Sequence, residues 1–181
     1  MEMEFFTQKE RDEIVSYGIW RIKNTCSMII TMLLIGCIFH AFFQSIIFFI
    51  CFIPLRKYAG GYHADTQIRC YIISTMIFVM ACIFMKCVPP DDFWLLFIQY
   101  TCLLVLWLFA PVEHENHKLE NQEKQNYKQK SRQILSGIYI GIIICNITEK
   151  YGIAIAMRTS IIVTGICILM GMIKELLRRI R

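Results

Sequence analysis

The stretch CSMIITMLLIGCIFHAFFQSIIFFICFIPL, residues 26–55, is a long apolar run that decides how the rest of the chain is arranged. The hydrocarbon core of a bilayer is about 30 Å thick, and roughly 20 helical residues cross it. The run is therefore too long for one crossing and too short for two full ones. If both of its flanks lie on the same side of a membrane, it must fold back near residues 36–44 into two short or re-entrant helices.

The composition of the whole chain agrees with a membrane environment. Hydrophobic residues make up 56% of the 181 residues, charged residues only 18%, and the mean hydropathy is +0.50. These values exclude an ordinary soluble domain. Further apolar segments follow at 70–88, 93–110, 134–147 and 152–173. We expect an all-α, polytopic integral membrane protein with about six membrane helices, of which the first two are short or re-entrant.

Lysine and arginine predict the orientation, because they gather in the cytoplasmic loops of membrane proteins. They are concentrated in the N-terminal segment, in the connections 56–69 and 111–133, and at the C-terminus. The short connections 89–92 and 148–150 carry one lysine between them and are expected to be external turns. The expected location is therefore the cell membrane, with multiple crossings, a cytoplasmic 56–69 connection and a long polar loop at 111–133.

Residues 1–24 are charged throughout and lack the pattern of a secretory signal peptide. Their apolar residues recur at spacings of three and four, which predicts an amphipathic helix lying in the membrane interface. A solvated cytosolic helix is the alternative. We therefore divide the chain into this N-terminal helix, 1–24, and a membrane-embedded domain, 25–181.

Cys70 differs from the other cysteines of this chain, which has nine in all. The other eight lie in apolar runs, where cysteine acts as a small hydrophobic residue. Cys70 opens a predicted helix at the cytoplasmic boundary, within the stretch RKYAGGYHADTQIRC, residues 56–70. Asp65 and Thr66 offer an N-cap, which would place Cys70 near the positive end of the helix dipole. A helix N-terminus, a nearby cation and an imidazole all favour the reactive thiolate.

His63 is the imidazole closest to Cys70 in the sequence. In one continuous helix the two side chains would lie about 10 Å apart along the axis, which is too far for a hydrogen bond. The chain must break between them, and Gly60 and Gly61 give the loop the freedom of positive φ angles. From spacing alone, the alternative is an interfacial histidine on a connecting loop and a cysteine that does not contact it.

The stretch RKYAGGYHADTQIRCYIIS, 56–74, resembles the central signature of the accessory gene regulator B (AgrB) family, membrane cysteine endopeptidases of Gram-positive quorum sensing. FAPVEHENHKL, 109–119, resembles a second landmark of that family. Chain length, the charged N-terminus and the order of the apolar segments match as well. The loop after Pro111 departs from the family pattern, because its charges are more mixed than the strongly basic stretch of some members.

The resemblance implies that His63 and Cys70 are catalytic. The implied substrate is a precursor peptide of the AgrD type with an amphipathic leader and an acidic tail. Cleavage would release the tail, leave the signal peptide as an acyl-enzyme thioester, and allow ring closure to a thiolactone or lactone. We expect substrate binding by the residues that flank the dyad, Arg56, Lys57, Arg69, Gly60 and Gly61.

The expected partners are the AgrD-like precursor, the lipid bilayer and a second copy of the chain in a homodimer, without nucleic acid. We expect no cofactor and no metal, because HENH, 114–117, is one residue short of the HExxH zinc spacing. A non-catalytic membrane transporter or peptide exporter subunit is the alternative function. In such a protein His63 and Cys70 would be incidental.

Overall fold

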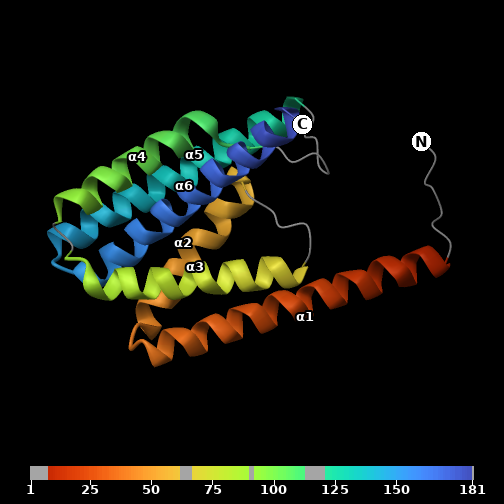
Figure 1. The fold of residues 1–181 in the computed structure, drawn as a ribbon, viewed down its shortest axis with the longest axis horizontal. Helices are drawn as coiled ribbons and strands as arrows, with labels where there is room; N and C mark the ends of the chain where they lie inside the picture. The colour runs from red at the N-terminus through yellow and green to blue at the C-terminus, as the bar shows by residue number, and fades with distance from the viewer. Residues whose placement is uncertain (1–7, 62–66, 90–91, 113–120, 181) are drawn as a thin grey trace.

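The computed structural model describes residues 8–61, 67–89, 92–112 and 121–180. Over these residues the chain forms helices and no strand, which confirms the all-α prediction. The helices are α1 (Gln8–Ile38), α2 (Phe42–Ala59), α3 (Gln67–Cys87), α4 (Phe93–Phe109), α5 (Asn121–Ile147) and α6 (Tyr151–Ile180) (Figure 1).

The long apolar run folds back where the sequence predicted. The turn between α1 and α2 is closed by the Ala41 amide, which donates to the Gly36 carbonyl at 2.8 Å, and His40 takes a positive φ of 51°. Gly36 lies against the side chain of Ser45, so the two helices approach closely at this point. The charged N-terminal segment and the first apolar segment form one helix from Gln8 to Ile38, because no proline or turn sequence separates them. The division at residue 24 stays a prediction.

The expected polar loop at 111–133 is largely helical, which corrects the sequence reading. α5 begins at Asn121, so residues 121–133 form the first half of a 27-residue helix. Ser131, in this polar half, is buried at 1% exposure. The amide and lysine side chains of the segment gave it the composition of a loop, but packing of one side against the rest of the protein stabilises the helix.

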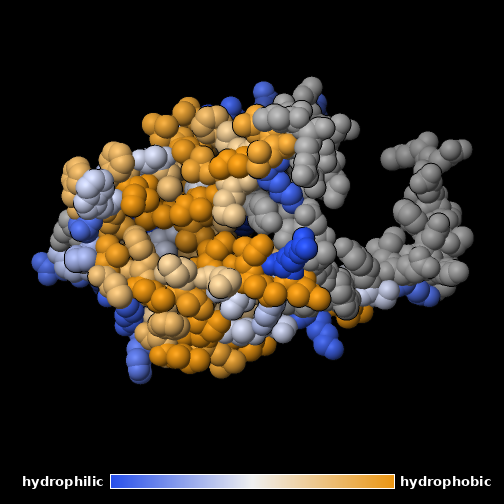
Figure 2. All heavy atoms as spheres, in the orientation of Figure 1, coloured by the Kyte–Doolittle hydropathy of each residue, from blue (hydrophilic) through white to orange (hydrophobic). Residues whose placement is uncertain are grey.

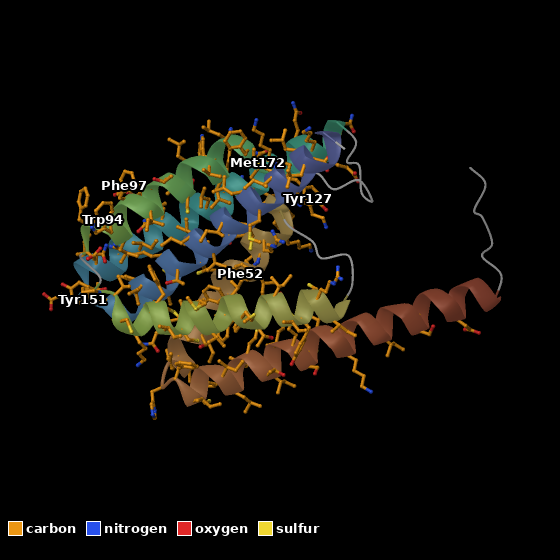
Figure 3. All side chains as sticks on the ribbon, viewed as in Figure 1. Phe52, Trp94, Phe97, Tyr127, Tyr151 and Met172 are labelled. Atoms are coloured by element: carbon orange, nitrogen blue, oxygen red, sulfur yellow. The ribbon has the colours of Figure 1, made fainter. Side chains whose placement is uncertain are left out.

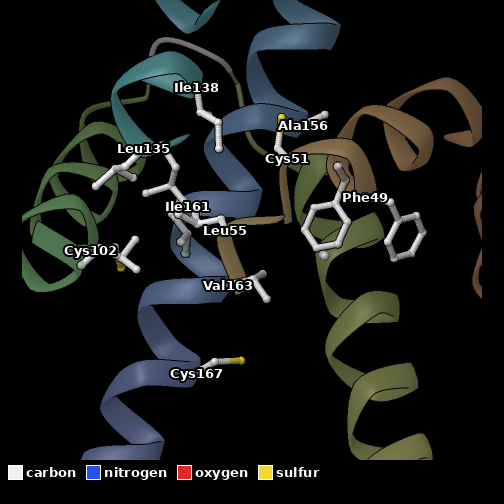
Figure 4. Close-up of a cluster of buried hydrophobic side chains, with 14 of the residues drawn as sticks. Phe49, Cys51, Leu55, Cys102, Leu135, Ile138, Ala156, Ile161, Val163 and Cys167 are labelled. Atoms are coloured by element: carbon white, nitrogen blue, oxygen red, sulfur yellow. The ribbon is translucent and has the colours of Figure 1, made fainter. Parts of the chain in front are cut away.

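α6 forms the centre of the molecule and packs against α2, α3, α4 and α5. Residues 154–165 of α6 are buried apart from a half-buried Met157, and Figure 4 shows Ala156, Ile161 and Val163 of this helix among the side chains of its neighbours. At Gly165 a Cβ atom would lie 2.7 Å from the Cβ of Cys102, so the missing side chain lets α4 and α6 pack closely. The core therefore lies along the middle of α6, over residues 154–168.

The surface of the helices is strongly apolar, as expected of a protein surrounded by lipid. Figure 2 shows hydrophobic side chains over most of the bundle, with hydrophilic ones toward its ends. Three helical segments are long and apolar enough to cross a membrane, namely Phe42–Ala59, Ile68–Cys87 and Tyr151–Leu177. Thr25–Ile38 and Phe93–Phe109 are apolar but shorter. The expected total of six membrane helices stays a prediction.

The helices alternate in direction, so the segments that carry most of the lysines and arginines meet at one end of the bundle. The C-terminal end of α2, the start of α3 and the start of α5 lie at this end (Figure 1). Tyr127 of α5 lies here, whereas Trp94, Phe97 and Tyr151 lie at the opposite end (Figure 3). Cys70 therefore lies at the same end as the other basic segments of the sequence.

Candidate functional site

The chain leaves α2 through two glycines whose conformations other residues rarely adopt. Gly60 has φ 74° and ψ −148°, and Gly61 has φ 116°. The Gly60 amide donates to the Arg56 carbonyl at 3.2 Å, which ends the helix. The positive φ angles expected from the sequence are therefore present, and they turn the chain out of the helix at the end of α2.

Gly60 pairs with the segment that follows α4. A parallel bridge joins Gly60 to Val112, and the Val112 amide donates to the Ala59 carbonyl at 3.0 Å. A Cβ atom on Gly60 would collide with the carbonyl oxygen of Val112, so only glycine allows this approach. The two stretches that the sequence analysis singled out, 56–74 and 109–119, thus meet in the structure.

Gly61 is held on its other side by α6. A Cβ atom on Gly61 would lie 3.0 Å from the carbonyl oxygen of Cys167 and would collide with the guanidinium of Arg56. Cys167 is itself buried at 7% exposure. The loop therefore starts in a narrow space between α6 and the segment after α4.

Arg56 points into this space instead of outward to solvent. It lies in the last turn of α2, is partly buried, and its Nη1 donates to the Gly60 carbonyl. The side chains of Cys167 and Cys70 lie within electrostatic range of its guanidinium. The structure thus brings together three of the predicted site residues, Arg56, Gly60 and Gly61, at the end of α2.

Cys70 lies in the first turn of α3 and is half-buried. The next residue, Tyr71, donates a hydrogen bond from its hydroxyl to Thr31 of α1 at 2.9 Å, which fixes the rotation of the start of α3. His63, with Asp65 and Thr66, lies outside the described residues, so its expected contact with Cys70 stays a prediction.

The other predicted binding residues are more open to solvent. Lys57 and Arg69 are exposed, and the Lys57 ammonium lies 5.6 Å from the ring centroid of Tyr58. The same ring packs edge-on against Tyr127 at 5.4 Å and has Lys130 at 5.3 Å. Tyr127 and Lys130 belong to α5, so the polar half of that helix contacts the end of α2 and is not a solvated tether.

Sequence reasoning missed the residues that surround the glycine loop from other helices. Val112 is an ordinary apolar residue, although it lies in the second stretch that carried the resemblance. Cys167 lies in an apolar run, where nothing in the sequence distinguishes its backbone carbonyl from its neighbours. Among the described residues, no group of histidine, cysteine, aspartate and glutamate side chains is arranged to hold a metal ion.

Comparison with known proteins supports the family resemblance carried by the two stretches that meet at this site. The family model described as Accessory gene regulator B matches residues 3–177. A protein of Clostridium perfringens (strain SM101, type A) named "Putative AgrB-like protein" is 25% identical over 166 residues, covering 86% of this chain and 76% of that protein.

Two further relatives extend this comparison. A second AgrB-like protein from Clostridium perfringens (strain 13, type A) is 27% identical over 149 residues, covering 78% of this chain and 70% of its own length. A similarly named protein of Listeria monocytogenes serotype 4a (strain HCC23) is 30% identical over 99 residues, covering 55% of this chain and 48% of its own length. No solved structure matches this chain.

Proposed function

Because the chain belongs to the accessory gene regulator B family, and so has a role in the agr quorum-sensing system, we propose that it is a membrane-embedded cysteine endopeptidase that processes an AgrD-like precursor peptide. The observation that carries this proposal is the position of Cys70. It lies in the first turn of α3, and the guanidinium of Arg56, which is bonded to Gly60, lies within electrostatic range of it. A cation and a helix N-terminus both favour the thiolate needed for nucleophilic attack.

The proposed reaction begins when Cys70 Sγ attacks the carbonyl carbon at the C-terminal end of the signal segment. His63 takes the thiol proton and gives it to the nitrogen of the peptide bond as that bond breaks. The acidic tail leaves as a free amine, and the signal segment remains attached to Cys70 as a thioester. A cysteine or serine of the peptide then attacks the thioester carbonyl. This step returns the thiol of Cys70 and closes a thiolactone or lactone ring.

The proposed roles of the flanking residues follow from their exposure. Arg56 is partly buried and bonded to Gly60, so it stabilises the loop and the negative charge that develops near Cys70. Lys57 and Arg69 are exposed, and their proposed role is to attract the acidic tail of the precursor. Such exposed ion pairs contribute about 0–1 kcal/mol each, so they attract the tail without determining where it is cut.

The membrane concentrates both reactants in one plane. An amphipathic leader binds at the lipid interface, and Cys70 lies at the end of the apolar helix Gln67–Cys87, where that interface is expected. A cytoplasmic location of this end places the nucleophile where the precursor is made. The homodimer also remains a proposal, and the ring chemistry depends on the precursor.

Co-expression with the candidate precursor, followed by mass spectrometry, tests this function. We expect the wild-type chain to yield the released tail and a covalent adduct whose mass matches the precursor without its tail, that is, the leader and the signal segment, and which hydroxylamine removes. Cys70→Ala should yield neither product. Cys167→Ala is the matched control, because Cys167 is the other thiol near Arg56. Normal processing by Cys70→Ala would refute the mechanism, and loss of processing in both variants would indicate damage to the fold.

A further inference from the structure

A groove of about 730 Å³ lies between the end of α4 and the first half of α5. α4 and α5 lie on the opposite side of the bundle from α1 and α3, so this groove is separate from the surroundings of Cys70 (Figure 1). Its lining includes two cations, Lys128 and Arg132, and no carboxylate. The proposed peptidase reaction makes no use of this groove.

Arg132 is held in a fixed position within the groove. Its Nη2 donates to the Trp107 carbonyl at 3.1 Å, and its guanidinium carbon lies 4.7 Å from the centroid of the Trp107 ring. Its Nε is buried and has no hydrogen-bond partner among the described residues. The groove therefore contains a preoriented cation, whose planar guanidinium suits an anionic ligand.

The position of the groove along the helices coincides with the expected membrane boundary. Trp107 lies near the end of the apolar helix α4, which ends at Phe109. On α5 the polar segment ends and the apolar one begins next to Arg132, at Ile134. Tryptophan and basic residues are enriched at this depth of a membrane protein, where lipid headgroups meet the hydrocarbon.

The lining changes from polar to apolar along α5. Lys128, Gln129 and Gln133 line the polar part, whereas Gly137 and Ile140 line the part nearer the hydrocarbon. Beyond the groove the apolar surface continues through exposed side chains, among them Leu104, Ile143 and Ile144. A ligand that matches this gradient has an anionic head and a long apolar tail.

We propose that this groove binds an anionic phospholipid. The phosphodiester contacts Arg132 and Lys128, and an acyl chain lies along Trp107 and Ile140. A soluble acidic peptide fits less well, because it would leave the apolar part of the groove uncovered. The proposal depends on the membrane location of the chain and not on its peptidase activity, so either one can fail without the other.

Fluorescence quenching by brominated lipids tests the proposal on the full chain. Trp20→Phe with Trp94→Phe leaves Trp107 as the only tryptophan of the chain. The protein is reconstituted in phosphatidylcholine vesicles that contain a small fraction of brominated phosphatidylglycerol or of brominated phosphatidylcholine. We expect phosphatidylglycerol to bind next to Trp107 about fivefold or more tightly than phosphatidylcholine, because each basic residue near an anionic lipid contributes about that factor.

The variants separate a specific site from general surface attraction. Lys128→Gln, which changes an exposed side chain, should lower the preference severalfold, and Lys128→Gln with Arg132→Gln should remove it. Lys124→Gln with Lys130→Gln takes the same charge from the same helix outside the groove lining and should leave the preference intact. Equal binding of the two lipids, or equal losses in both double variants, would overturn the proposal. Displacement of phosphatidylglycerol by a soluble glutamate-rich peptide would overturn it in favour of a peptide site.

Discussion

Gly60 and Val112 form a parallel bridge that joins the end of α2 to the segment after α4. The bridge connects the stretch that contains Cys70 with the second stretch that resembles the AgrB family. It leaves no room for a side chain at Gly60, because a Cβ there would collide with the Val112 carbonyl oxygen. The start of the loop toward Cys70 is therefore defined by backbone contacts and not by the flexibility of two glycines.

Replacing Gly60 by alanine should damage the site. Alanine at φ 74° and ψ −148° is strained by about 1–3 kcal/mol, and the collision with Val112 adds to this cost. We expect a lower melting temperature in detergent and a loss of precursor processing of about tenfold or more. Gly18→Ala is the matched control, because Gly18 lies in α1 with nothing within 4 Å of its position. Equal behaviour of the two variants would show that the bridge does not hold the loop.

Arg56 and Lys57 are neighbours in sequence, but we expect them to differ in their effect on processing. Arg56→Lys keeps the charge and loses the planar donor that bonds the Gly60 carbonyl, an interaction of a kind that contributes about 1.5–3 kcal/mol. We expect processing to fall about tenfold or more. Lys57→Gln removes an exposed ammonium over Tyr58, and we expect a loss of less than about threefold. The amount of released tail per unit of membrane protein measures processing by each variant. A larger loss for Lys57→Gln than for Arg56→Lys would reverse the assigned roles.

Tyr127 connects the polar half of α5 to the end of α2 through its contact with Tyr58. Aromatic pairs of this kind contribute about 0.5–1.5 kcal/mol beyond their buried area. Tyr127→Ala should therefore lower both the melting temperature and processing, whereas alanine at its exposed neighbour Asn126 should change neither. If Tyr127→Ala behaves like wild type in both measurements, the first half of α5 acts only as a tether.

Most of the fold could be predicted from the sequence, because it depends on the lengths of the apolar runs and on the positions of the basic residues. A continuous apolar run of membrane length predicts a helix whatever its partners are, as α3 and α6 show. The fold-back before α2 followed from the same-side placement of basic residues on its two flanks. The start of α5 could not be predicted in this way, because residues 121–133 have the composition of a solvated segment and are stabilised by contacts of Tyr127 and Ser131.

At the site, the sequence indicated which residues matter but not how they face. Arg56 was expected to bind substrate from the 56–69 connection, like Lys57. In the structure it turns inward, because the carbonyl of Gly60 beyond the helix end accepts its hydrogen bond. Which of the two neighbouring basic residues turns inward depends on contacts with Gly60 and with α6 at Cys167. No local sequence pattern encodes these contacts.

His63 is the expected proton acceptor, and its loss should change the pH dependence of the reaction. Without a base the thiol must lose its proton to solvent, which happens more readily as the pH rises. His63→Ala should therefore process little precursor near neutral pH and more as the pH rises. A time course of cleavage at several pH values measures this, with the wild-type chain as reference. Unchanged cleavage at neutral pH would exclude His63 as the base.

Cys70 and Cys87 lie at opposite ends of α3 and together provide a test of orientation. The helix places them roughly 25 Å apart, Cys87 is exposed and Cys70 is half-buried. In chains whose only cysteine is Cys70 or Cys87, a membrane-impermeant maleimide applied to intact cells should label Cys87 and miss Cys70. Inverted vesicles should give the opposite result, because the basic end of the bundle is expected in the cytoplasm. Labelling of Cys70 from outside would place the nucleophile on the side that a newly made precursor has not reached, and peptide export would then have to precede cleavage.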